Sequence, residues 1–149
     1  ARAGEIAGAE RSVVALLDNH ETHALGLFNL PEDLRQTPLP LVDTAEAKVV
    51  ETRAPMALLT EEEWSAYGLE SAYVGVPILD RLGQPVGLIC CHGLKPERNG
   101  EALAALTLLA ALILPAVESE RALRHAQQVE IAEEPRRRKK KNEDLTFFQ

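Results

Sequence analysis

The sequence predicts an α+β domain: an antiparallel sheet of five or six strands, helices packed on its faces, and one long helix at the C-terminal end. Three observations support this fold class. Two strongly β-forming runs, residues 71–79 and 86–92, flank a short segment that contains a glycine. Shorter strand-like and helix-like segments alternate before them, and a long helical pattern follows them. This mixture is typical of an antiparallel sheet with helices on its faces.

The first two strands are predicted at residues 11–17 and 23–30. The run RSVVALL is β-branched and aliphatic, and the pair Asp18-Asn19 behind it is a strong turn signal. The run HALGLFNL follows and ends at a proline, so the two strands should form an antiparallel hairpin. The proline-rich residues 32–41 are expected to cross the molecule as an irregular segment.

Two short helices and one short strand are predicted next. Asp43 stands at an N-cap position, and Glu46 three residues later completes a pattern like a capping box for a helix that ends at Arg53. Residues 56–59 are apolar enough for a strand. A second helix should occupy residues 60–68, because a threonine followed by three glutamates suits the positive end of a helix.

The second half of the chain carries the clearest signals. The strands at residues 71–79 and 86–92 should pair as a hairpin, with Gly83 in the connection where a positive φ is expected. Residues 101–134 are helical in pattern, and Pro115 predicts a kink. The first half of this helix is apolar on nearly every side and should be buried, whereas the part from Glu118 onward is polar and should project outward.

Composition limits the domain count and the partners. A chain of 149 residues with 46% hydrophobic residues suffices for one core, so we expect a domain at residues 1–117, a helical linker at 118–135, and a charged tail or the start of a further segment at 136–149. The formal charge of -7 disfavours nucleic acid. Because the chain opens on alanine, we expect it to be a piece of a larger protein.

Membrane insertion and secretion are not predicted. The longest apolar run, residues 102–117, is shorter than a membrane span and contains a threonine and a proline, so it is interpreted as a buried helix. No signal peptide pattern is present. Cys90 and Cys91 are adjacent, and vicinal cysteines rarely bridge, so the cytoplasm is the expected compartment.

The central hairpin resembles part of a known family. The residues Gly75-Val76-Pro77-Ile78, then Asp80, Gly83 and the run VGLI at 86–89, followed by a long helix, are similar to the C-terminal half of a GAF domain. The resemblance covers residues 11 to 123 and implies a GAF/PAS-like sheet, a ligand pocket between one sheet face and its helices, and pairing through terminal helices.

A narrower likeness concerns the cofactor. The pair Cys91-His92 resembles the end of the equivalent strand in phytochrome GAF domains, beside their bilin pocket. The preceding helix, residues 58–67, holds neither Cys nor His, which excludes covalent bilin attachment there. A noncovalent tetrapyrrole or a small metabolite stays open as the ligand, and its identity cannot be read from the sequence.

The resemblance supplies a set of candidate pocket residues. They come from the helix at 60–68 and from the two strands of the central hairpin: Trp64, Tyr67, Tyr73, Val74, Cys91 and His92. No catalytic residue and no metal ligand is assigned, because His20 and His23 have no accompanying cysteine or carboxylate motif. Cys90 and Cys91 should point to opposite faces of their strand and are most simply structural.

The predicted function is that of a small-molecule-sensing regulatory domain in a larger signal-transduction protein. The ligand would shift the exit helix, and a homodimer formed through residues 103–129 would place two such helices side by side. A covalently linked histidine kinase or nucleotide cyclase is the kind of effector that this implies. Two alternatives remain: a GAF-type thiol enzyme similar to methionine sulfoxide reductases, and a dimerisation module without a ligand.

Overall fold

The computed structural model describes residues 9–18, 21–30, 39–40, 42–94 and 99–147. Within these ranges a six-stranded sheet forms the centre of the molecule, with strand order β3-β2-β1-β6-β5-β4. Every pairing is antiparallel. The predicted fold class is therefore confirmed. The strands are β1 (Arg11–Asp18), β2 (Glu21–Phe28), β3 (Leu39–Pro40), β4 (Met56–Leu58), β5 (Tyr73–Leu79) and β6 (Pro85–His92).

The two predicted hairpins form the middle of the sheet. β1 pairs with β2, and β5 pairs with β6 around a turn in which Gly83 has φ 75°. β1 and β6 then join the hairpins, with Val13 opposite Cys90 and Leu16 opposite Gly87. The proline-rich segment lies mostly outside the described residues, but Leu39 and Pro40 within it pair with β2 as β3, a strand that the sequence did not predict.

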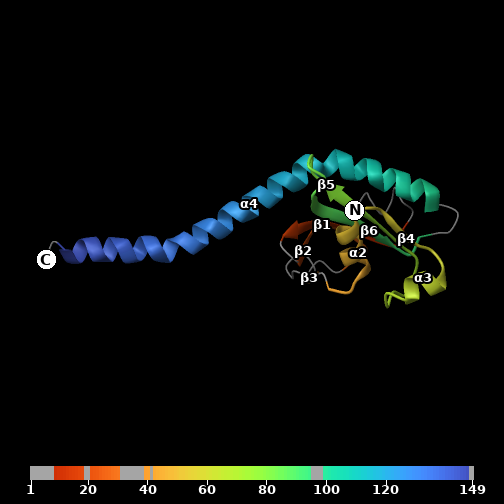
Figure 1. The fold of residues 1–149 in the computed structure, drawn as a ribbon, viewed down its shortest axis with the longest axis horizontal. Coiled ribbons are helices and arrows are strands. Elements are labelled where there is room, and N and C mark those ends of the chain that lie inside the picture. The colour runs from red at the N-terminus through yellow and green to blue at the C-terminus, as the bar shows by residue number, and fades with distance from the viewer. Residues whose placement is uncertain (1–8, 19–20, 31–38, 41, 95–98, 148–149) are drawn as a thin grey trace.

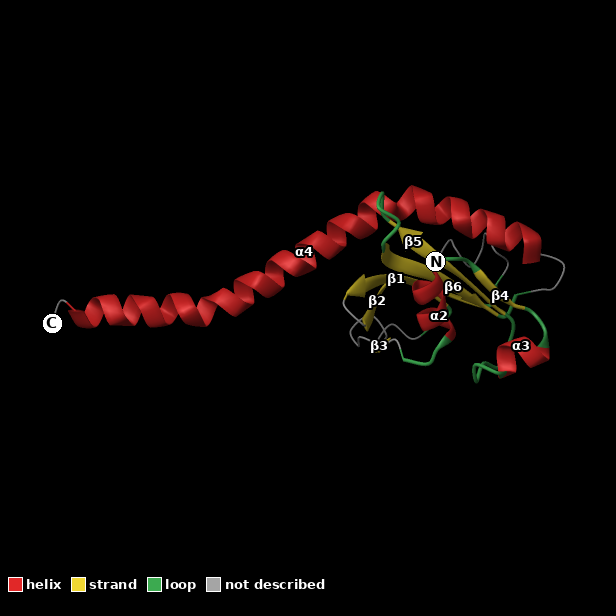
Figure 2. Ribbon diagram, viewed as in Figure 1, coloured by secondary structure: helices red, strands yellow, loops and turns green. Residues whose placement is uncertain are grey.

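A single long helix, α4 (Asn99–Phe147), covers one face of the sheet and then leaves it. In Figures 1 and 2 its first part lies along the sheet and the remainder projects far into solvent. The buried residues Ala102, Leu106, Ala110 and Val117 hold the first part against the sheet. The helix runs past the predicted end at residue 134, and both Pro115 and Pro135 lie inside it.

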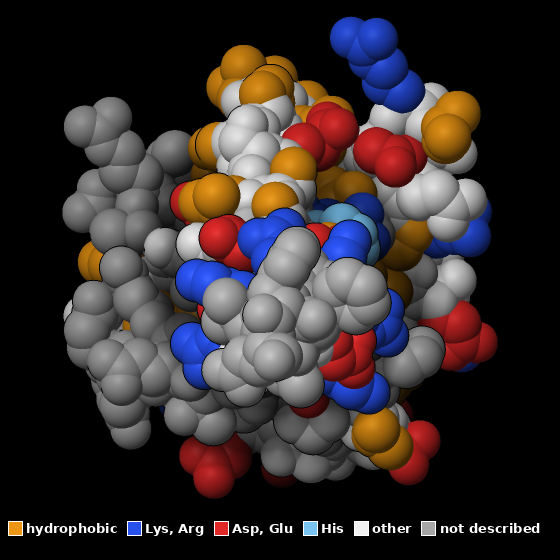
Figure 3. All heavy atoms as spheres, turned by 90° about the vertical axis from the view of Figure 1, so that its left-hand side faces the viewer, with side chains coloured by type: hydrophobic (Ala, Val, Ile, Leu, Met, Phe, Trp, Pro, Cys, Tyr) orange, Lys and Arg blue, Asp and Glu red, His pale blue; other side chains and the backbone are white. Residues whose placement is uncertain are grey.

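The apolar content of α4 is unusual for a helix on a sheet. By length and composition the stretch Gly100–Glu143 could cross a membrane, with a mean hydropathy of 2.0 in its most apolar part. That part packs on the sheet along one side, but only 22% of it is buried, so the prediction that it is a buried helix was wrong for its outer side. Figure 3 shows hydrophobic side chains gathered at the top of the molecule, where Figure 1 places this part of α4. A large apolar surface therefore stays uncovered.

The opposite face of the sheet carries α2 (Ala45–Thr52) and α3 (Glu61–Ser65). The prediction of the first N-cap was wrong by one residue. Thr44 caps α2 by accepting a hydrogen bond from the Ala47 amide, whereas Asp43 has φ 51° and lies outside the helix. The cap of α3 matches the prediction, since Thr60 and Glu63 form a reciprocal capping box.

Candidate functional site

The face of the sheet beneath α2 and α3 is filled around Tyr73. Its side chain is completely buried and packs with Val49 of α2 and Leu88 of β6. The phenol hydroxyl donates to Cys90 Sγ over 3.4 Å. Gly75 makes room for the ring, because a Cβ there would collide with the Tyr73 hydroxyl and lie 2.9 Å from Val49 Cγ2. The described residues therefore leave little space between α2 and the sheet.

His92 lies beside Tyr73 at the end of β6. The two rings meet edge to face with their centroids 5.1 Å apart, an arrangement favoured by the ring quadrupoles. The His92 side chain is half-buried. Burial lowers its pKa below the ordinary 6.5, and the charge of Arg11 on the neighbouring strand lowers it further. Both effects favour the neutral form of His92 over the cation.

The six candidate pocket residues divide between the two faces of the sheet. Trp64 and Tyr67 lie half-buried on and after α3, and they pack with Tyr73 in the same cluster. His92 joins them through its ring contact with Tyr73. Val74 and Cys91 are opposite each other in the strand register and face α4 instead, within the other core cluster. The structure thus brings four of the six residues together and places two elsewhere.

Both thiols are poorly suited to nucleophilic chemistry. Cys90 faces the α2 side and Cys91 faces α4, as strand alternation predicts, and each is buried and free. Burial raises the pKa of Cys91 to about 12. Burial, and then the charge of Glu46, raise the pKa of Cys90 well above its usual range. Since the thiolate is the reactive form, neither residue is activated.

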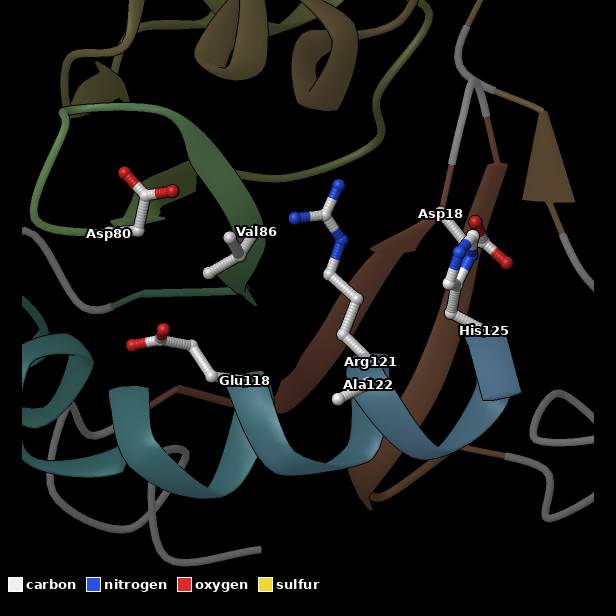
Figure 4. A pocket seen from close by; sticks show the side chains of 7 residues that line it. All are labelled: Asp18, Asp80, Val86, Glu118, Arg121, Ala122 and His125. Carbon is white, nitrogen blue, oxygen red and sulfur yellow. The ribbon is translucent and has the colours of Figure 1, made fainter. Parts of the chain in front are cut away.

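A second site lies where α4 leaves the sheet. A pocket of about 440 Å³ opens between the helix and the ends of two strands, and Figure 4 shows its lining side chains. Two strands and the β5–β6 turn contribute three residues and α4 contributes four: Asp18, Asp80 and Val86, then Glu118, Arg121, Ala122 and His125. The pocket thus combines carboxylates, one guanidinium and one imidazole on a small apolar floor.

Two long-range contacts hold α4 against the β1–β2 hairpin next to this pocket. Gln128 donates to Asp18 Oδ2 over 3.1 Å. Arg124 Nη1 lies 3.5 Å from His23 Nδ1. Because a guanidinium only donates, this contact requires a His23 tautomer with its proton on Nε2. The exit of α4 is therefore fixed by side chains as well as by the core.

Sequence reasoning missed this second site. Its residues are far apart in the chain and meet only because α4 crosses the ends of β1 and β6. Taken singly, Asp80 looks like a turn residue, and its Oδ1 does accept from the Leu82 and Gln84 amides. His125 and Arg121 are solvent-exposed helix residues, as their surroundings in the sequence suggest. No local pattern marks them as neighbours, so only the tertiary arrangement could find them.

Comparisons with solved structures support the fold. The GAF domain of an Acinetobacter phosphoenolpyruvate-protein phosphotransferase matches with a TM-score of 0.70 at 15% identity, covering 81% of this chain and 78% of that one. The GAF-B domain of DevS from Mycobacterium smegmatis matches with a TM-score of 0.61 at 18% identity, covering 84% and 91%. A type II free methionine-R-sulfoxide reductase from Thermoplasma acidophilum matches with a TM-score of 0.60 at 17% identity, covering 74% and 80%.

Comparison of the sequence with curated proteins found no match. A family model does match: the GAF domain model aligns with residues 1–117. This range takes in all six strands, α2, α3 and the part of α4 that packs on the sheet. The chain therefore belongs to the GAF domain family, the regulatory and sensory modules of signalling proteins.

Proposed function

We propose that this GAF domain regulates a covalently attached effector by transmitting its own state through α4. The observation that carries the proposal is the continuity of α4, which begins in the core at Ala102 and extends as one helix to Phe147. A rigid helix rooted in the sheet converts a small shift of the core into a displacement at its far end. A histidine kinase or a nucleotide cyclase is the kind of effector that such a helix suits.

The proposed sensing step places a small metabolite on the α3 side of the sheet. Trp64 and Tyr67 are half-buried there and pack against the cluster that contains Tyr73, whose ring meets that of His92. Two aromatic side chains, a buried phenol and a neutral imidazole are typical of a site for a small, partly apolar molecule. A ligand acts by binding one arrangement of the helices more tightly than another. Val74 and Cys91 lie beneath α4, so a change in the helix arrangement would alter their packing although they do not touch the ligand.

We further propose that two copies pair through the uncovered face of α4. Leu108, Leu112 and Leu123 are 64%, 69% and 52% exposed. Their spacing puts them on one side of the helix. An apolar stripe of this kind at the surface indicates a protein interface. Pairing would set two exit helices side by side, and the two free thiols suit the reducing cytoplasm as the compartment.

The ligand-free dimerisation module is the second candidate, and the filled space around Tyr73 favours it. Native mass spectrometry of the purified chain separates the two. A bound small molecule supports the sensor, whereas a bare dimer that binds no metabolite supports the second candidate. The thiol enzyme has less support, because Cys90 and Cys91 are both buried and protonated.

Relay through α4 is tested by changing its helical phase. The chain is fused to the catalytic part of a histidine kinase, and alanines are inserted one at a time after Val129. Each insertion rotates the effector about the helix axis, so kinase activity should rise and fall with a period of about 3.6 residues. Kinase activity that is unchanged by the insertions, or that falls steadily with the number of inserted residues, would contradict a rigid relay.

A further inference from the structure

The pocket where α4 leaves the sheet is lined by charges of both signs. Arg121 extends from α4 toward β6 and the β5–β6 turn, and Glu118 lies one turn before it on the same helix (Figure 4). Within the described part of the chain, no hydrogen bond or ion pair engages the Arg121 guanidinium. Asp18 and Asp80 contribute two further carboxylates from β1 and the β5–β6 turn. Asp18 and Asp80 are partly engaged, since Asp18 Oδ2 accepts from Gln128 and Asp80 Oδ1 accepts from two backbone amides. Arg121 and Glu118 have no such partner among the described residues.

The charge pattern selects a chemical class of ligand. A guanidinium binds a carboxylate through parallel N–H donors, and carboxylates bind an ammonium group. Three carboxylates exceed one guanidinium, so a simple anion would be repelled. A molecule with both an anionic and an ammonium group would satisfy both sets. We propose that this pocket binds a zwitterionic amino acid, with its carboxylate on Arg121 and its ammonium group toward Glu118 and Asp80, which lie on the same side of Arg121 in Figure 4.

The size and surroundings of the pocket suit this class. A volume of about 440 Å³ is within the range for small-molecule sites and exceeds the needs of a single amino acid backbone. Val86 and Ala122 supply apolar surface for a side chain, and His125 supplies a further polar contact. The site lies on the α4 face of the sheet, separate from Tyr73 and His92 on the other face.

Binding here would stabilise one position of α4. Arg121 and Glu118 belong to the helix, whereas Asp18 belongs to β1 and Asp80 to the β5–β6 turn, so only the docked helix completes the site. A ligand that needs both walls binds the docked state more tightly and shifts the population toward it. The contact between Gln128 and Asp18 marks the same docked state. The effect on output rests on the proposed relay through α4, but the binding itself does not.

Isothermal titration calorimetry of the full chain with individual L-amino acids tests the site. At least one should bind, while its decarboxylated amine and its deaminated acid, each carrying one of the two charges, should bind at least about tenfold more weakly, as expected for a lost charge-assisted contact. Failure of every L-amino acid to bind overturns the proposal. Equal binding of the deaminated acid overturns the assigned class.

Two substitutions place the binding. Arg121→Ala and Glu118→Gln should each weaken it about tenfold to a hundredfold. The matched controls Arg136→Ala and Glu120→Gln change exposed residues of the same helix outside the pocket and should leave binding unchanged. Unchanged binding in Arg121→Ala and Glu118→Gln places the ligand elsewhere and refutes the site. Because the alanine-insertion fusion measures the relay without any added amino acid, failure of the site and failure of the relay are distinguished.

Discussion

At Gly87, α4, β1 and β6 approach one another closely. An added Cβ would lie 2.5 Å from the Ala15 carbonyl oxygen and 3.3 Å from both Ile78 Cδ1 and Val117 Cγ1. The two methyl groups could yield by a few tenths of an ångström. The carbonyl oxygen belongs to the β1 backbone, which pairs with strands on both sides, so it cannot withdraw without weakening the sheet.

Gly87→Ala should therefore destabilise the domain. Overpacking of a tight core destabilises the folded state by about 1 to 3 kcal/mol. Alanine also lowers the conformational entropy of the unfolded chain, which stabilises the folded state by about 0.4 to 1 kcal/mol. The expected net loss is about 1 to 2 kcal/mol. Gly100→Ala is the matched control, because its Cβ would meet nothing within 4 Å and it lies in α4. It should be neutral or stabilise by up to about 1 kcal/mol.

Urea unfolding at one fixed protein concentration measures both variants. Circular dichroism follows the helices, and the fluorescence of Trp64, the one tryptophan of the chain, follows the α3 side. Coincident transitions support a two-state analysis. If Gly87→Ala is as stable as the wild type, the close approach of α4 and β1 at this position is incorrect, and with it the rooting of the exit helix in the core.

Three further outcomes follow from the described geometry. The pKa of His92 is lower in the folded state than the unfolded 6.5, so the unfolded state binds more protons below that pH. The urea midpoint of the wild type should therefore fall relative to that of His92→Gln as the pH drops below about 6.5. Midpoints of the two proteins that change in parallel with pH would contradict this. Cys90 and Cys91 should react with a thiol reagent only after denaturation, and rapid labelling of the native protein would show an exposed thiolate. Thr60→Ala removes the capping box and should cost about 1 kcal/mol in urea unfolding, whereas Thr60→Ser should restore most of it.

The fold was predictable because its decisive signals are local. Two β-forming runs around Gly83 predict the β5–β6 hairpin, and the threonine at position 60 followed by three glutamates predicts the start of α3. The N-cap of α2 was misplaced because Asp43 and Thr44 are both good capping residues and only the backbone decides between them. β3 was not predicted because Leu39 and Pro40 are too short a run, in a proline-rich segment, to carry a strand pattern of their own.

The candidate site was less accessible to sequence reasoning. Strand alternation already shows that Tyr73 and Val74 point to opposite faces, and so do Cys91 and His92. The β5–β6 register pairs Tyr73 with His92 and Val74 with Cys91, and this determines which candidate residues share a face of the sheet. The register itself depends on pairing between strands and not on a local pattern. Whether Tyr73 fills the space under α2 or lines an open pocket depends on packing density. The pocket lined by Arg121 and Glu118 depends wholly on where α4 crosses the sheet.

The central claim is that the α4 helices of two copies pair side by side and project as a rigid unit from the two GAF domains. Ile131 is 73% exposed on the projecting part of α4, so a nitroxide label on Ile131→Cys reports the separation of the two helices by pulsed electron spin resonance. The label should spare the buried Cys90 and Cys91. Helices packed together lie about 8 to 10 Å apart between axes, so a single short and narrow distance is predicted, and Leu112→Lys should abolish it. A dipolar signal that is absent, or a broad distribution that Leu112→Lys leaves unchanged, would contradict paired helices.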